Sequence, residues 1–174
     1  MIEPAQVFEL VKGLPPWLAV MIMAALPIAE LRLSLPLALV VYDMNPLRAY
    51  FLSVVGNMVP IVPILLLFGP MHALLDNVWP FKPFFAWLLA RVEKHRGRFE
   101  RWGALALISF VAIPLPVTGA WTGSVAAFVF KVRKREAFVL LLLGVMIAGC
   151  VVMAATYSGL MTYSGLKELK GGLS

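Results

Sequence analysis

The amino-acid sequence predicts an all-α integral membrane protein built from an inverted repeat of two units. Three observations support this: the chain is mostly apolar, its apolar residues form four long stretches, and two of these stretches are interrupted near their middles. Of 174 residues, 61% are hydrophobic and 14% are charged, and the mean hydropathy is +0.90. Soluble proteins carry about 25% charged residues, so too few polar side chains remain here to cover a surface in water.

The four apolar stretches are residues 16–42, 47–69, 103–130 and 137–158. Each is long enough to enter or cross a bilayer. The second and fourth are regular and are predicted to be transmembrane helices. Pro27 and Pro36 interrupt the first, and Pro114 begins a run of prolines and glycines in the third. Because proline breaks helices, we expect the first and third stretches to fold as helical hairpins.

Basic residues predict the side of the membrane from which each hairpin enters. The connection 70–101 contains six lysines and arginines, and the loop 131–136 contains four. Because such residues mark the cytoplasmic side, both flanks of the stretch 103–130 are expected in the cytoplasm of a cell bounded by an inner membrane. A re-entrant hairpin satisfies this condition and a straight span does not. The stretch 16–42 has weakly basic flanks and is expected to enter from the opposite side.

The two halves also resemble each other in sequence. At an offset of 87 residues, ALPIAELRLSLPLALVV lies over VAIPLPVTGAWTGSVAAF, and Pro27 falls on Pro114. After a slip to 88, Gly56 falls on Gly144. The same order of broken stretch, short loop and regular span occurs twice. Since the halves are expected to enter from opposite faces, the repeat is inverted, as in many secondary transporters.

Residues 1–174 are expected to form a single membrane domain. Its predicted segments are 1–15, 16–69, 70–101, 103–158 and 159–174. The segment 1–15 is predicted to be an interfacial helix and 159–174 a C-terminal tail, while 16–69 and 103–158 are the two repeats. The connector 70–101 carries its apolar residues on one helical stripe, which predicts an amphipathic helix on the cytoplasmic leaflet. That helix either anchors the protein or gates a substrate path.

Glu30 and Arg32, in the segment PIAELRLSLP, are the most unusual residues of the sequence. An ionisable side chain at membrane depth persists mainly when it is paired or faces a wet cavity. Residues two apart do not share a helical face, but a broken backbone lets both point into one pocket. In one interpretation Glu30 carries a proton and Arg32 binds an anionic group. In the other, the two form a buried ion pair that locks the hairpin.

Polar residues elsewhere are predicted to complete the pocket. Thr118, Trp121 and Thr122 lie in AIPLPVTGAWTGS and are expected to line the wall opposite Glu30. Asn57 lies in GNMVPIVP and is expected to contact the substrate and orient the first hairpin. The alternative for AIPLPVTGAWTGS is tight helix packing through small residues.

Other functional classes have less support in the sequence. The single cysteine, Cys150, excludes an internal disulfide and, with two histidines in the chain, argues against a zinc site. No nucleophile with a base, metal cluster or paired carboxylates is evident, so we expect neither an enzyme nor a cofactor or metal. The net charge of +6 arises from residues that flank apolar segments, which favours anionic lipid headgroups over nucleic acid as partners.

The segments PIAELRLSLP, GNMVP, AIPLPVTGAWTG and GVMIAG, in this order and spacing, resemble the small multidrug export protein family. That family is similar in layout to the DedA superfamily, whose two re-entrant hairpins meet near the midplane and whose members are implicated in lipid transport, including undecaprenyl phosphate. The resemblance implies a pocket at the hairpin junction, with Glu30 in the position of a DedA acidic residue. The arginines of the second DedA hairpin are missing here, and Arg32 is the candidate to replace one.

These observations predict a secondary transporter, coupled to protons through Glu30, that moves an amphipathic substrate such as a lipid phosphate across the inner membrane. The expected substrate contacts are Arg32, Asn57, Thr118, Trp121 and Thr122. The alternatives are a small multidrug exporter and a non-transporting membrane scaffold. Expected partners are membrane lipids, the substrate and a second copy in a homodimer, because a chain of this length makes a thin wall around a pocket.

Overall fold

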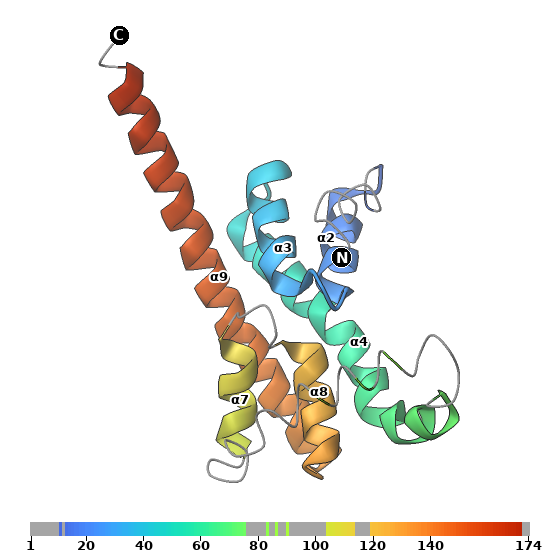
Figure 1. Cartoon of the computed structure of the whole chain (residues 1–174). Coiled ribbons are helices and arrows are strands. Elements are labelled where there is room, and N and C mark those ends of the chain that lie inside the picture. Colours follow the sequence, from blue (N-terminus) through green and yellow to red (C-terminus); the bar gives the residue numbers. More distant parts are fainter. Residues whose placement is uncertain are drawn as a thin grey trace.

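The computed structural model describes residues 11, 13–75, 83, 86, 90, 104–113 and 119–171. Its helices are α2 (Pro16–Ala25), α3 (Glu30–Pro36), the π-helix η1 (Leu37–Val41), α4 (Pro46–Leu75), α7 (Ala104–Ala112), α8 (Ala120–Val129) and α9 (Lys134–Gly171) (Figure 1). All regular elements of these described residues are helical, which confirms the predicted all-α class.

The long helices α4 and α9 form the centre of the molecule. Among the described residues, Pro46–Leu67 and Lys134–Leu160 are long and apolar enough to cross a bilayer. The first of these has 22 residues, which extend about 33 Å at the rise of an α-helix, against a hydrocarbon thickness of about 30 Å. The two helices are antiparallel, because the Tyr50 hydroxyl donates to the Met146 carbonyl (2.8 Å) while the Lys134 ammonium donates to the Leu66 carbonyl (3.1 Å).

The bond between Lys134 and Leu66 has its origin in a proline of α4. Pro70 has no N–H, so the Leu66 carbonyl four residues earlier lacks its usual donor within the helix. The Lys134 ammonium supplies that donor from the start of α9. The missing intrahelical hydrogen bond is therefore replaced by one that connects the two long helices.

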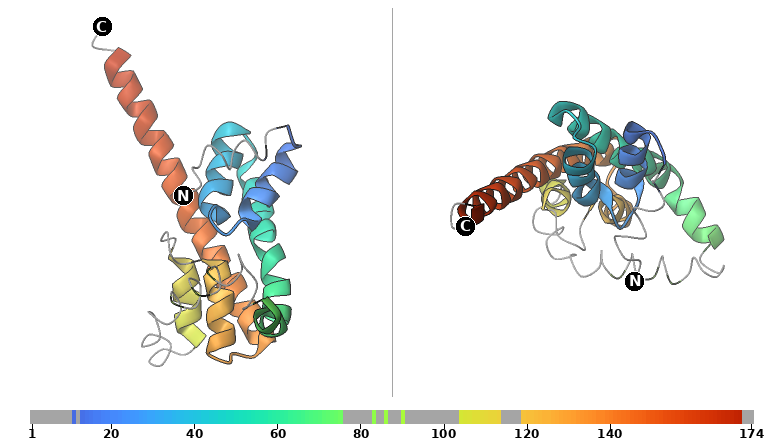
Figure 2. Two further views of the ribbon diagram at one scale, coloured as in Figure 1. Left: turned by 45° about the vertical axis from the view of Figure 1, so that its right-hand side comes forward. Right: turned by 90° about the horizontal axis from the view of Figure 1, so that it is seen from above.

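Two pairs of short helices lie beside α4 and α9. Helices α2 and α3 are joined by residues 26–29, and α7 and α8 lie side by side in all views (Figures 1 and 2). Helix α2 packs on α4 and α3 on α9, whereas α7 packs on α9 and α8 on α4. In each pair, the first helix thus packs on the long helix that follows it, and the second packs on the other long helix.

Each pair has an open end, at which its two helices are not joined to each other, and the two open ends lie at opposite ends of the molecule. The first pair leads into the start of α4 through residues 42–45, and the second leads into the start of α9 through residues 130–133. Since α4 and α9 are antiparallel, these starts lie far apart. Figure 2 shows α2 and α3 at one end and α7 and α8 at the other.

The spacing of the elements recurs along the chain. Helix α4 begins at Pro46 and α9 at Lys134, an interval of 88 residues. The connection before each contains a residue in the left-handed region, Asp43 (φ 45°) and Lys131 (φ 55°), also 88 apart. Residues with side chains rarely adopt this conformation, so the two connections share an uncommon backbone shape at equivalent positions.

Glycines at equivalent positions let the short helices approach the long ones. A Cβ added to Gly56 would lie 2.6 Å from the carbonyl oxygen of Met21, and one added to Gly144 would lie 2.8 Å from Cβ of Val111 and 3.2 Å from the carbonyl oxygen of Ile108. Gly56 and Gly144 are 88 residues apart, and Met21 and Ile108 are 87 apart. The offsets that relate the halves in sequence therefore also relate these contacts.

Several predicted segments are only partly described. Of the segment 1–15, the structure describes Val11 and residues 13–15; Val11 is fully buried in a cluster that includes Met23. Of the connector 70–101, only residues up to Leu75 and isolated positions lie within the description. Helix α9 continues to Gly171 and includes most of the predicted tail 159–174.

Candidate functional site at the junction of the short helices

Glu30 is the first residue of α3 and has an uncommon backbone conformation. Its φ is 48°, in the left-handed region that residues with side chains rarely adopt. Its N–H donates to the Leu26 carbonyl (3.0 Å), which closes the turn between α2 and α3. The whole residue is only 7% exposed. Such strain persists where surrounding contacts hold it, and it is frequent at functional sites.

The Glu30 carboxylate lies at the N-terminus of α8, a helix from the other half of the chain. It accepts hydrogen bonds from the backbone amides of Ala120 and Trp121. It also lies so close to Gly119 that any side chain at that position would overlap both carboxylate oxygens. Helix α8 has no side-chain cap from its own N-cap residue. Glu30 thus provides the negative charge that a helix N-terminus favours.

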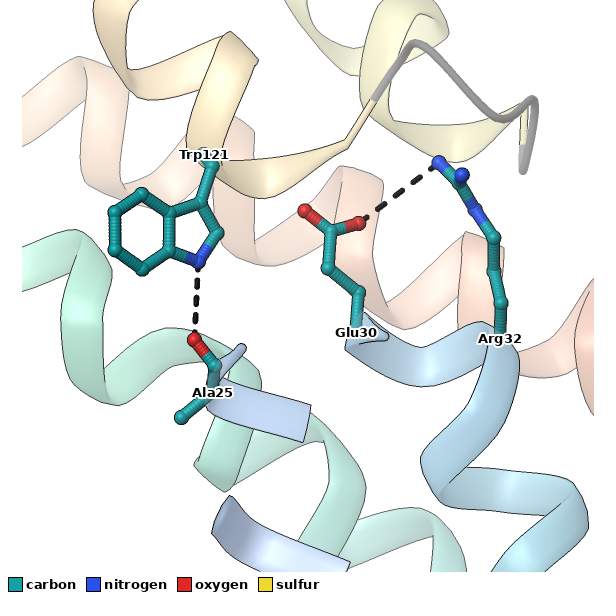
Figure 3. Close-up of polar contacts among 4 residues, drawn as sticks. All are labelled: Ala25, Glu30, Arg32 and Trp121. Carbon is teal, nitrogen blue, oxygen red and sulfur yellow. Dashed lines mark hydrogen bonds and ion pairs between the residues drawn. The ribbon is translucent and has the colours of Figure 1, made fainter. Parts of the chain in front are cut away.

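Arg32 is the second charged group at the junction. Its guanidinium lies 3.8 Å from the Glu30 carboxylate, and its side chain is 24% exposed (Figure 3). The two side chains point to the same side because Glu30 lies at the break between α2 and α3. The carboxylate is therefore held from two directions, by the guanidinium of its own hairpin and by the amides of α8.

Trp121 makes a second connection between the halves. Its indole Nε1 donates to the carbonyl of Ala25, the last residue of α2 (3.1 Å; Figure 3). Trp121 was predicted to contact the substrate, but in this structure its indole N–H is bonded to another part of the protein. Thr122 is buried, with 6% exposed, and Thr118 lies outside the described residues.

Asn57 lies beside the charged pair in the interior. It is fully buried, and within the described part of the chain neither atom of its side-chain amide has a hydrogen-bond partner. Asn57, Glu30 and Arg32 line the same cavity of about 10 Å³, close to the smallest volume that holds one water molecule. Buried amides almost always have partners, so the cavity is a polar space suited to water or a polar group of a ligand.

The glycines of AIPLPVTGAWTGS predict close backbone approach and unsatisfied amides, and in the structure the group that approaches Gly119 is the Glu30 carboxylate. Two buried serines were not predicted. Ser34 and Ser53 are fully buried and, among the described residues, their hydroxyls lack partners. No sequence signal separates them from Ser124, whose hydroxyl donates to the carbonyl of Ala120 in the ordinary helical manner (2.6 Å).

Among the described residues, two helices are long and apolar enough to cross a bilayer, which indicates an integral membrane protein. Residues 30–151 match a family described as "Putative small multi-drug export protein", and because this match covers more than half of the chain, the protein belongs to that family. No curated protein and no solved structure matches the chain. The family description points to an exporter rather than an enzyme, and the similarity to the DedA superfamily stays a prediction.

Proposed function

We propose that this protein is a proton-coupled secondary transporter with its substrate site at the junction of the two hairpins. The family description supports membrane export. The observation that carries the proposal is the position of Glu30: its carboxylate is buried between a guanidinium and two backbone amides of the opposite half. A carboxylate kept in such a place inside a membrane protein is a candidate for ion coupling.

We further propose that the two halves are an inverted repeat with re-entrant hairpins. Three observations support this: the antiparallel long helices, the open ends of the hairpins at opposite ends of the molecule, and the 88-residue spacing of helix starts and glycine contacts. In this arrangement the connector 70–101 and the loop 131–136 lie in the cytoplasm of a cell whose inner membrane holds the protein. The closed ends of the hairpins then meet near the midplane, where transporters of this class bind substrate.

The geometry supports an exchange of anions at the N-terminus of α8. In the resting state Glu30 occupies a site made of two amides and the Arg32 guanidinium. When Glu30 takes up a proton, it loses its charge and those donors are released for an anionic group of a substrate. Among the described residues that line the cavity, Arg32 is the only other charged one. Binding of one anion is thereby linked to binding of one proton.

This site fits an amphipathic substrate with an anionic group, such as a lipid phosphate. The planar guanidinium of Arg32 and the backbone amides suit phosphate or carboxylate oxygens. Asn57 contributes an amide without a partner in the described structure. The wall of the site is completed by Thr118, Trp121 and Thr122 once the hydrogen bond between Trp121 and Ala25 opens. When that bond and the contacts of Glu30 are both lost, the hairpins can separate, as alternating access requires.

Proteoliposomes with an internal pH dye test this function. Dodecyl phosphate is the probe, and proton flux upon its addition is the signal. We expect the parent protein to couple the two movements, Glu30→Gln to abolish proton flux, and Arg32→Gln to weaken the response to dodecyl phosphate. Arg48→Gln is the matched control, because Arg48 is an exposed arginine at the start of α4. Unchanged flux through Glu30→Gln would eliminate the coupling role.

A small multidrug exporter of cationic compounds is the second candidate, and the family description favours it. Arg32 repels a cation, so its removal has opposite effects on the two substrate classes. In the same liposomes, ethidium transport that rises in Arg32→Gln indicates a cationic substrate. A decrease of dodecyl phosphate transport in that variant indicates an anionic one.

A membrane scaffold makes a different prediction for the charged pair. If Glu30 and Arg32 only lock the first hairpin, replacing both by leucine leaves the protein folded and equally or more stable, because apolar packing often replaces a buried ion pair without loss. Transport then shows no dependence on either residue. Loss of transport in a double variant with unchanged thermal stability rejects the scaffold.

A further inference from the structure

A groove lies between the two long helices, away from the hairpin junction. It joins the second half of the α4 span to the first turns of α9 and has a volume of about 380 Å³. Its walls include Val62 and Leu66 of α4 and Phe138 and Val139 of α9. These are apolar side chains, and the volume is within the range of small-ligand sites, about 300–1,000 Å³.

The walls of the groove are exposed on the surface of the two candidate spans. Leu66 and Val139 are each 53% exposed and Val62 is 43% exposed, although all three are apolar and belong to the helices that span the membrane. Water does not enter the hydrocarbon region to fill such a space. An acyl chain of a membrane lipid has the shape and polarity that these walls require.

One end of the groove is basic. Lys134 and Arg135 belong to its lining, and both are exposed. The Lys134 ammonium is held at this end by its bond to the Leu66 carbonyl (3.1 Å) and keeps two further N–H donors. Arg133, one residue earlier, already pairs with Glu136. The positive charge that remains at the groove is therefore that of Lys134 and Arg135.

We propose that this groove binds one anionic phospholipid, with an acyl chain between α4 and α9 and the phosphate at Lys134 and Arg135. A basic pocket between transmembrane helices is the arrangement that recognises anionic headgroups. The apolar length of the groove adds selectivity for a lipid over a free phosphate ion. The site does not depend on transport at the junction, because none of its lining residues borders the cavity around Glu30.

Native mass spectrometry tests this site directly. The protein is reconstituted in vesicles of equal parts phosphatidylglycerol and phosphatidylcholine, extracted in mild detergent, and its retained lipids are identified and counted. We expect one phosphatidylglycerol per chain in preference to phosphatidylcholine. Arg135→Gln should lower phosphatidylglycerol retention about fivefold, the effect of one basic residue near a headgroup, and leave phosphatidylcholine unchanged. Val139→Trp should fill the groove and lower retention of both lipids.

Two matched variants control for charge and bulk. Arg48→Gln removes an exposed arginine at the opposite end of α4, and Val151→Trp enlarges an exposed valine of α9 outside the groove. Both should retain lipid like the parent. Arg135 is exposed, so Arg135→Gln is expected to fold even if Val139→Trp does not. Any of three results would overturn the proposal. These are equal retention of the two lipids, equal losses of lipid in Arg48→Gln and Arg135→Gln, and displacement of the lipid by inorganic phosphate. Conversion of a dimer to a monomer by Val139→Trp would assign the groove to a second copy instead.

Discussion

At the scale of single residues, the junction depends on the contact between the Glu30 carboxylate and the backbone of Gly119. Glu30 is in a left-handed conformation and buried, which is costly unless its carboxylate is well held. The amides of Ala120 and Trp121 hold it only because position 119 has no side chain. One glycine and one strained glutamate thus connect the two halves of the chain.

The variant Gly119→Ala tests this connection. The added methyl group would overlap the carboxylate oxygens and lie 2.6 Å from Cδ of Glu30, so the carboxylate has to leave the α8 amides. We expect a loss of stability of about 1–3 kcal/mol, as in other overpacked interiors, and a loss of coupled proton flux. Thermal unfolding in detergent and the liposome assay measure these effects. Gly159→Ala is the control, since its added Cβ would meet no atom of the described structure within 4 Å beyond the local backbone of its own helix. Equal effects of both variants would reject the close contact.

A substitution at Asn57 is expected to have opposite effects on stability and on transport. Asn57→Leu replaces a buried amide that has no partner among the described residues with an apolar side chain of similar shape. Removing an unsatisfied polar group is expected to raise the unfolding free energy by about 1–3 kcal/mol. Transport of dodecyl phosphate should fall, because the cavity then loses a polar contact. A variant that is less stable, yet transports normally, would show that Asn57 has a structural role instead.

The charged residues of the junction, and a source of backbone donors in AIPLPVTGAWTGS, can be predicted from the sequence, but the pairing of those donors with Glu30 cannot. Glu30 and Arg32 stand out because charge is rare in apolar segments. Every residue other than proline has a backbone amide, so the amides of Ala120 and Trp121 have a role only because they lie at the start of a helix. The bond from Trp121 to Ala25 joins residues 96 positions apart, a pairing that no local pattern encodes.

At the scale of elements, glycines set the distance between the short and the long helices. Gly56 lies against the backbone of Met21 on α2, and Gly144 lies mainly against the side chain of Val111 on α7. Backbone cannot move aside as readily as a side chain. The two contacts therefore occupy equivalent positions but differ in how they would respond to an added methyl group.

Alanine substitutions at these glycines should differ in effect. Gly56→Ala places a methyl group 2.6 Å from the Met21 carbonyl oxygen and should lower the unfolding free energy by about 1–3 kcal/mol. Gly144→Ala should cost less. Val111→Ala in the same chain should restore a small part of the loss, because it removes Cγ1 (3.1 Å) and leaves more room for the remaining Cβ (2.8 Å) to move. Thermal unfolding in one detergent compares the four proteins. Equal losses without rescue would contradict the assigned contacts.

The extent of the elements shows what hydropathy predicts and what it does not. The first stretch was expected to be interrupted at Pro27 and at Pro36. Residues 26–29, which include Pro27, form a turn, but Pro36 lies inside α3, which continues directly into η1. The predicted spans end at residues 69 and 158, where apolar character declines, but α4 continues to Leu75 and α9 to Gly171. A helix can continue past an apolar stretch because backbone hydrogen bonding does not depend on hydropathy. Hydropathy therefore predicts the part of a helix that lies in lipid, and not the residue at which the helix ends.

At the scale of the whole molecule, function at the junction requires two hairpins that enter the membrane from opposite sides. The two helix pairs that would form these hairpins have opposite orientations, because α4 and α9 are antiparallel (Figures 1 and 2). The proposed homodimer adds protein around a junction that a chain of 174 residues surrounds thinly. Both properties depend on the placement of the helices in a bilayer, which labelling of single cysteines measures.

Such labelling starts from Cys150→Ser, because Cys150 is the only native cysteine. We expect a membrane-impermeant maleimide to reach Pro15→Cys and Leu47→Cys from one side, since Pro15 precedes α2 and Leu47 lies at the start of α4, just after the proposed first hairpin. Ala104→Cys and Arg133→Cys, at the two ends of the second hairpin, should react only from the other side, in inverted vesicles if that side is cytoplasmic. A chain in which Pro15→Cys and Leu47→Cys label from different sides has a first stretch that crosses the membrane. The carboxylate of Glu30 would then belong to a transmembrane helix, and exchange between opposing hairpins would have no structural basis.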